Sequence, residues 1–162
     1  MTIQAAQQLL SLLKSELQAA KQLNVLLLEE REALTNSNTA VIDEVSQKKQ
    51  PLLVQLEHSG RQRNQLLKNV GFPPGKSGLE AFIDNQDVAV ARQLSQLTGE
   101  LKELARSCHE HNQINGGIVN VNRQYIQRAM SILRGREPDS DAYGPGGEYT
   151  SQVVRQPLIG RV

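Results

Sequence analysis

The chain has 162 residues, of which 38% are hydrophobic and only 3% aromatic, and it contains no tryptophan. This length supports one or two small domains with a buried core, and a composition rich in leucine suits helix interfaces better than a β-sandwich or a cofactor pocket. The 18 basic and 17 acidic residues are interspersed and give a formal net charge of +1, which argues against a nucleic-acid-binding surface.

The cysteine content and the hydropathy of the chain indicate the cellular compartment in which it acts. Cys108 is the only cysteine, so the chain cannot form an internal disulfide, which fits a reducing environment. The longest apolar run, residues 25–28, is too short to span a bilayer. The N-terminus lacks the basic region and apolar segment of a secretory signal peptide. We therefore expect a cytoplasmic protein.

The first predicted helix covers residues 3–34, where apolar side chains recur every three or four positions and so share one face. The turn that follows ends it, and Asn38 is a suitable N-cap for a second helix over residues 39–70. Pro51 lies within this second helix, where it removes one backbone donor. We expect a kink at Pro51 rather than a break.

A linker follows at residues 71–78, because Gly71 and the two prolines after it are a typical stop for a helix. Ser77 and Glu80 have the spacing of a capping box, which predicts a short helical segment over residues 79–83. A third long helix is predicted over about residues 86–134, and Gly135 ends it.

The third long helix contains the strongest turn signal of the chain. Asn115-Gly116 flanked by branched apolar residues is typical of a β-hairpin. Yet a coiled-coil-like spacing of alternating three and four residues continues on both sides of it. The residues in this register are Leu94, Leu97, Leu101, Leu104, Cys108, His111, Asn115, Ile118, Asn122, Tyr125, Ala129 and Ile132. A hairpin would break this register, so we predict that the segment is helical.

Together these elements predict an all-α fold, an antiparallel three-helix bundle or coiled coil with an over-long third helix. The helical domain is expected to cover residues 1–135. Residues 136–162 are rich in glycine and poor in periodic apolar residues, which predicts a flexible C-terminal tail.

Polar residues in the register of the third helix have two interpretations. Asn115 and Asn122 either face solvent, because the helix is covered only in part, or they line a docking groove and fix the register of a partner. In a groove, Gly116 and Gly117 would let another backbone approach closely, and the amides would bind its peptide groups.

The length of the third helix favours a partner. At about 1.5 Å per residue it is about 20 Å longer than the other two, so its end beyond about Val121 should extend past them. That end still carries an apolar stripe, which implies either a partner helix or a second copy of the chain.

Catalytic and metal-binding motifs find little support in the sequence. His109 and His111 lie about 200° apart on a helix, so they cannot share one ion, and a zinc site would need His58 from another helix. The glycine-rich nucleotide motifs and the nucleophile elbow are missing. We expect no enzyme activity, no cofactor, no metal and no small-molecule substrate.

Three motifs and one tail feature resemble the flagellar export chaperone FlgN family, over Ser11 to about Gly147. The motifs are Glu30-x-x-Ala33-Leu34, Lys49-x-x-Leu52-Leu53-x-x-Leu56 and Asn112-x-x-Asn115-Gly116, and the tail feature is Tyr143-Gly144-x-x-Gly147. The chain departs from the family pattern at Asn38, where an acidic residue is common, and at Pro51.

The resemblance implies a cytoplasmic type III export chaperone without ATPase activity. Such a chaperone binds C-terminal helical segments of hook-filament junction proteins, keeps them unassembled, and delivers them to the membrane export gate. The alternative interpretation is a structural coiled-coil protein that has no client and covers the same stripe by self-association. For the chaperone, a homo-oligomer of the free chain is a further expectation.

The residues predicted to contact partners lie on the third helix and in the tail. They are Asn112, Asn115, Ile118, Val119, Asn122, Tyr125, Ile126, Met130, Leu133 and Tyr143. Tyr143 lies eight residues past Gly135, so the tail can hold its large, rigid side chain near the end of the helix. We expect it to dock on the cytoplasmic domain of the export gate.

Overall fold

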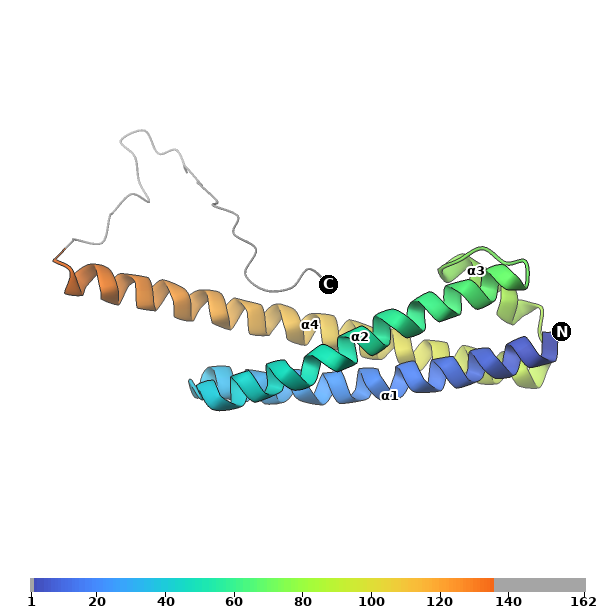
Figure 1. Ribbon diagram of the computed structural model, residues 1–162, viewed down its shortest axis with the longest axis horizontal. Coiled ribbons are helices and arrows are strands. Elements are labelled where there is room, and N and C mark those ends of the chain that lie inside the picture. Colours follow the sequence, from blue (N-terminus) through green and yellow to red (C-terminus); the bar gives the residue numbers. More distant parts are fainter. Residues whose placement is uncertain (1, 136–162) are drawn as a thin grey trace, which may run out of the picture. The chain divides into compact units, whose positions relative to one another are not determined.

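The computed structural model describes residues 2–135, and all regular structure in this range is helical (Figure 1). The helices are α1 (Thr2–Thr35), α2 (Thr39–Asn69), α3 (Lys76–Asp84) and α4 (Val88–Leu133). The all-α helical bundle predicted from the sequence is confirmed. The prediction of a flexible tail concerns residues outside the described range.

The contacts divide the chain into two units, Met1–Val119 and Asn120–Val162. The first unit contains α1, α2, α3 and the N-terminal part of α4, and α2 returns antiparallel to α1 (Figure 1). The described part of the second unit contains the remainder of α4. We call residues 120–133 the α4 extension.

The core of the first unit forms two apolar clusters. The larger one joins all four helices, and its buried members are Ala5, Ala6, Leu9, Leu13, Leu67, Leu79, Phe82, Ile83 and Leu94. The smaller one combines Leu23 and Leu27 of α1 with Cys108 of α4, and the partly buried Leu52, Leu53 and Leu56 of α2 pack against it.

Local signals explain where the long helices begin and end. The Asn38 side chain accepts a hydrogen bond from the Val41 amide at 3.3 Å, which confirms it as the N-cap of α2. Gly71 adopts φ 85°, a conformation that favours glycine, and the Phe72 amide closes the helix end on the Leu67 carbonyl at 2.9 Å. α2 continues unbroken through Pro51.

The connection before α3 differs from the prediction. α3 begins at Lys76 with Gly75 as its N-cap, and no side chain caps it, so the predicted capping box of Ser77 and Glu80 is wrong. The helix starts earlier because Gly75 adopts φ 92°, which only glycine reaches readily, and its carbonyl accepts from the Leu79 amide. The expected linker is correspondingly shorter at its C-terminal end.

A buried ion pair links α1 and α2. The Glu16 side chain is 5% exposed, and Arg63 of α2 donates a hydrogen bond to its Oε2. Its Oε1 has no hydrogen-bond partner among the described residues. Burial raises the pKa of Glu16, and the positive charge and hydrogen bond of Arg63 partly offset this effect.

Between residues 2 and 135, no helix combines the length and the apolar character needed to cross a bilayer.

Candidate partner-binding surface

The turn signal at Asn115-Gly116 lies within α4, so the prediction that this segment is helical is confirmed. Apart from the adjacent residues and the nearby backbone of α4, a Cβ atom added at Gly116 or Gly117 would meet no atom of the described residues within 4 Å. Both glycines are exposed. Packing inside the first unit therefore does not require glycine at either position.

Asn115 is the last buried residue of α4 and lies in a polar cluster with α1. It is 3% exposed, and its Nδ2 donates to the Leu27 carbonyl and to Glu30 Oε2, both at 2.8 Å. The Arg31 Nε donates to its Oδ1 at 3.3 Å. The amide is thus bonded within the chain, so the solvent-facing interpretation of Asn115 is wrong, whereas its contact with a partner stays a prediction.

The polar cluster extends to α2 and to one histidine. Lys49 Nζ donates to Glu30 Oε1 at 2.6 Å, and both side chains are largely buried. Arg31 Nη2 lies 2.8 Å from His111 Nδ1. Because a guanidinium can only donate, His111 Nδ1 is the acceptor in this contact.

Residues from the three helical motifs meet in this cluster. Glu30, Lys49 and Asn115 come from three different helices, and the chain of contacts from Lys49 through Glu30 to Asn115 joins them. All three motifs were recognised in the sequence, but neither their mutual contacts nor the part that Arg31 plays was predicted. The sequence signals that could have predicted the cluster were Asn115, a polar residue in the α4 register, and Glu30, an acidic residue near the end of α1.

Cys108 is a core residue rather than a reactive thiol. Its Sγ lies 3.7 Å from the Ala20 carbonyl, and burial raises the pKa of the thiol. A group of three or more His, Cys, Asp or Glu side chains that could hold a metal does not occur within residues 2–135.

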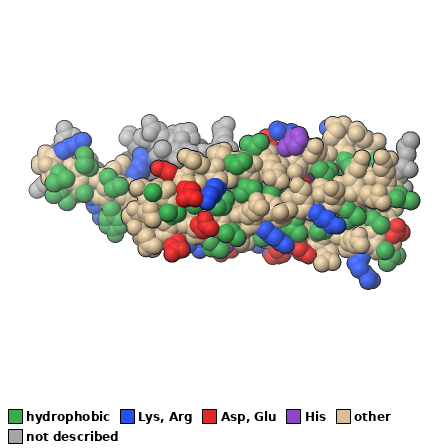
Figure 2. Space-filling model, turned by 60° about the horizontal axis from the view of Figure 1, so that its bottom comes forward, with side chains coloured by type: hydrophobic (Ala, Val, Ile, Leu, Met, Phe, Trp, Pro, Cys, Tyr) green, Lys and Arg blue, Asp and Glu red, His purple; other side chains and the backbone are tan. Residues whose placement is uncertain are grey.

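The α4 extension carries exposed apolar side chains. Val119, at the end of the first unit, is 49% exposed and Ile118 is half-buried. The exposed fractions within the extension are 48% for Val121, 66% for Tyr125, 64% for Ile126, 43% for Met130, 64% for Ile132 and 81% for Leu133. Figure 2 shows hydrophobic side chains gathered at the left end of the view.

The remaining predicted contact residues are placed as follows. Asn112 and Asn122 are exposed on α4, in different units. Tyr143 lies outside the described residues. Among the described residues of the predicted set, Asn115 is buried, Ile118 is half-buried and the others are exposed.

Comparison with known proteins identifies the family. The profile of the FlgN protein family matches residues 1–151. A crystal structure of a flagella synthesis protein FlgN from Pseudomonas aeruginosa is similar, with a TM-score of 0.63 and 34% sequence identity over 70% of this chain and 87% of that chain. The search of curated proteins gave no match. This chain belongs to the FlgN family of flagellar export chaperones.

Proposed function

We propose that this chaperone acts in the cytoplasm on hook-filament junction proteins. It binds a C-terminal helical segment of such a client on the α4 extension, prevents premature assembly of the client, and delivers it to the export gate. Family membership supports a flagellar protein as the partner. In this role the chain binds and releases proteins and carries out no chemical reaction.

The observation that carries the proposal is the exposed apolar face of the α4 extension. Six large hydrophobic side chains within residues 120–133 are 43% to 81% exposed. A helix that is apolar over so wide an arc is normally buried against other helices. An amphipathic client helix can supply this cover by laying its own apolar side chains on the face.

Two stripes make up this face. Ile118, Tyr125 and Ile132 continue the register that packs inside the first unit, with a spacing of seven residues. Val119, Ile126 and Leu133 form a second stripe with the same spacing, about 100° away on the helix. The preceding position of this stripe is Asn112, which is polar and exposed. The second stripe is therefore apolar only from Val119 onward, and the apolar face is wider toward the C-terminus.

Gly116 and Gly117 border this face and leave the α4 backbone open to close approach. Each glycine costs about 1 kcal/mol relative to alanine inside a helix. Since nothing in the first unit occupies the space that a side chain would take, contact with the client backbone is a reason to keep them.

The test uses full-length protein and the C-terminal segment of a hook-filament junction protein. The double variant Ile126→Asp and Leu133→Asp should lower client affinity by at least about thirtyfold, as expected for loss of central apolar contacts. The control, Val25→Asp with Val54→Asp, changes comparably exposed apolar residues of α1 and α2. Unchanged client affinity in the folded α4 variant would rule out this binding site.

Self-association is the competing occupant of the same face. The proposal expects a monomer in sedimentation experiments without client. A stable dimer that Ile126→Asp and Leu133→Asp dissociate, together with no client binding by the unmodified chain, would instead support a structural coiled-coil protein.

We further propose that Tyr143 docks the loaded chaperone on the cytoplasmic domain of the export gate. Tyrosine offers a large apolar face and few rotamers to immobilise, which suits an anchor on a tail. Tyr143→Ala should weaken gate binding and leave client affinity unchanged. Equal loss of both affinities would assign Tyr143 to the client site instead.

A further inference from the structure

The charges on the end of α4 differ in kind from those on its beginning. Residues 88–115 contain three acidic and three basic residues, and Arg106 forms an ion pair there with Glu103 at 3.1 Å. Residues 116–134 contain Arg123, Arg128 and Arg134 and no acidic residue. The apolar face of the α4 extension is therefore accompanied by positive charge alone.

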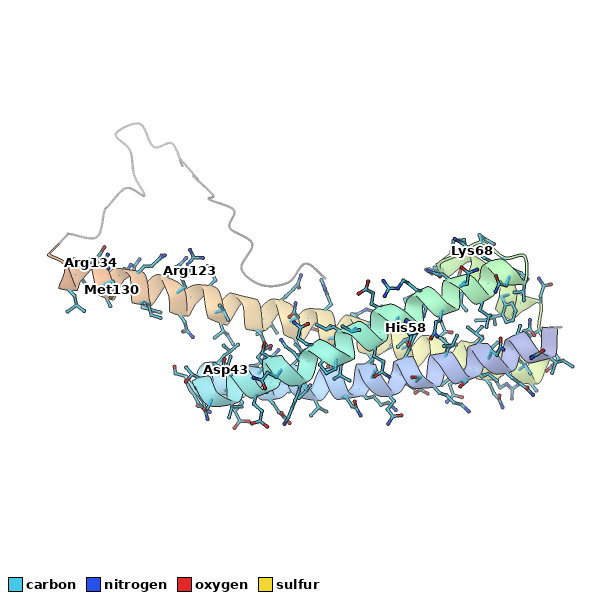
Figure 3. All side chains as sticks on the ribbon, in the orientation of Figure 1. Asp43, His58, Lys68, Arg123, Met130 and Arg134 are labelled. Atoms are coloured by element: carbon cyan, nitrogen blue, oxygen red, sulfur yellow. The ribbon has the colours of Figure 1, made fainter. Side chains whose placement is uncertain are left out.

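The arginines lie at both edges of the apolar face. At about 100° per residue, Arg123 and Arg134 lie within about 20° of each other and within about 40° of Met130, at one edge of the face. Figure 3 shows Arg123 and Arg134 projecting from the same side of α4. Arg128 lies about 20° from Val121, at the other edge. All three arginines are exposed.

This arrangement has the form of a helix interface in which flanking charges select the partner. Residues beside an apolar seam form ion pairs with the facing helix and set which partner and orientation are favoured. Arginine is suited to this role because its planar guanidinium can bind a carboxylate with two parallel hydrogen bonds.

We propose that the client segment on the α4 extension is an acidic amphipathic helix, with carboxylates on both sides of its apolar stripe. The inference rests on the proposed function and specifies the chemistry of its partner. Carboxylates of the client pair with Arg123 and Arg134 at one edge and with Arg128 at the other. These contacts steer the client to the α4 extension and set its orientation.

Asn122 decides between a protein helix and an anionic membrane surface, which also binds basic amphipathic helices. It lies near the middle of the apolar arc, within about 40° of both Ile126 and Leu133. An amide in that place would be costly against lipid, where it finds no partner. In a helix seam, a single asparagine pairs with another polar group and fixes the register.

The experiment measures binding of the full chain to synthetic helical peptides of about 18 residues, long enough to match residues 118–134. The peptides share one apolar stripe with a central asparagine, and their flanking positions are all Glu, all Gln or all Lys. At about 50 mM salt we expect the Glu peptide to bind about tenfold more tightly than the Gln peptide, and the Lys peptide to bind most weakly. The preference should fall below about threefold at 0.5 M salt because the charges are screened.

Two matched variants test which charges are responsible. Arg123→Gln with Arg128→Gln should reduce the preference for the Glu peptide over the Gln peptide to less than about threefold, because only Arg134 remains beside the face. The control, Arg92→Gln with Lys102→Gln, removes two exposed positive charges from the beginning of α4 and should keep the preference.

The outcomes separate this inference from the proposed function. Equal binding of the three peptides, lost in the Ile126→Asp and Leu133→Asp variant, would overturn the charge inference and leave the apolar docking site standing. Failure of all three peptides and of the client segment to bind would overturn both. Tighter binding to phosphatidylglycerol vesicles than to the Glu peptide would overturn the inference in favour of a membrane surface.

Discussion

The two parts of α4 share one helical register but differ in what covers them. In the part of α4 before residue 120, Leu94, Leu97, Leu101 and Cys108 of the register pack into the first unit, where Leu94 is fully buried and Cys108 is 9% exposed. In the α4 extension, Tyr125 and Ile132 occupy the same register and are 66% and 64% exposed. Periodicity therefore determines which side chains share a face, whereas neighbouring helices determine whether that face is buried.

The comparison also separates polar residues that stabilise the fold from those available to a partner. Asn115 and Asn122 occupy equivalent positions seven residues apart, yet within residues 2–135 the side-chain amide of Asn115 alone of the two forms hydrogen bonds. Four variants, each with a matched control, test this contrast.

The largest expected effect comes from the core of the first unit. Phe82 is fully buried and contacts the Phe72 ring edge-on, with centroids 5.4 Å apart. Phe82→Ala should lower the free energy of unfolding by about 3–5 kcal/mol because it leaves a cavity. Ile126→Ala in the α4 extension should change it by less than about 0.5 kcal/mol. Urea denaturation measures both values, and a comparable loss in both variants would mean that the extension is also part of the core.

The next effect concerns the polar cluster. Asn115→Asp replaces the donor to Glu30 and to the Leu27 carbonyl with an acceptor and places a second carboxylate beside Glu30. The loss of stability should be about 2–3 kcal/mol. Asn112→Asp, one turn earlier and exposed, should cost less than about 0.5 kcal/mol. If thermal unfolding shows the two variants to be equally stable, the hydrogen bonds of Asn115 contribute little.

A substitution at Gly116 should increase the stability of the free protein, by less than the preceding variants lower it. Gly116→Ala should stabilise the free protein by about 0.5–1 kcal/mol, because alanine favours the helix and its Cβ meets nothing within 4 Å. Gly99→Ala is the control, since it has the same open surroundings. Only Gly116→Ala should also weaken client binding, as calorimetric titration would detect. Destabilisation of the free protein by Gly116→Ala would contradict the helical geometry described here.

The smallest effect is a change in how stability depends on pH. Burial raises the pKa of Glu16, so the folded state holds its proton to higher pH than the unfolded state does. This group therefore makes stability fall as pH rises from about 4.5 through the folded pKa. Arg63 offsets part of the burial effect, which keeps the change small.

Glu16→Gln should remove this contribution, and denaturation curves between pH 4 and 8 would reveal the change in slope. Glu44→Gln is a control of opposite sign, because Lys48 lowers the pKa of Glu44 on the surface of α2. A steeper fall of stability with pH in Glu16→Gln would contradict the assignment.

The helices were predictable from local sequence because their signals are local. The caps at Asn38 and Gly71 and the long register of α4 depend on residues that are neighbours in the chain. The start of α3 could not be predicted in this way, because the conformation of Gly75 depends on its tertiary contacts. There the Asn64 side chain accepts a hydrogen bond from the Gly75 amide at 3.0 Å.

The buried polar residues were harder to predict for a related reason. Asn115 contacts groups of α1 that lie more than 80 positions away in the sequence, and periodicity does not say which helix faces a polar seam residue. Glu16 was more accessible to sequence reasoning, because it shares the helix face of Leu9, Leu13 and Ala20. The exposed apolar face of α4 followed from helix length, but its occupant depends on a molecule outside this chain.

The continuity of α4 has a consequence for the kinetics and energetics of binding. Residues 120–133 as a free peptide would be marginally helical, because starting a helix is unfavourable and segments shorter than about 12–15 residues rarely compensate. Attached to the part of α4 that the bundle holds, they only propagate an existing ladder of amide hydrogen bonds, which reaches from Arg134 to Met130 at 3.1 Å. The unfavourable nucleation step is therefore not required for residues 120–133.

The segment should therefore fray only from its C-terminal end. Protection of its amides against hydrogen exchange should decline steadily from Asn120 toward Leu133 rather than vanish at once. A binding surface that frays in this way meets its partner largely preformed, so less ordering entropy is lost on association than for a segment that folds on contact.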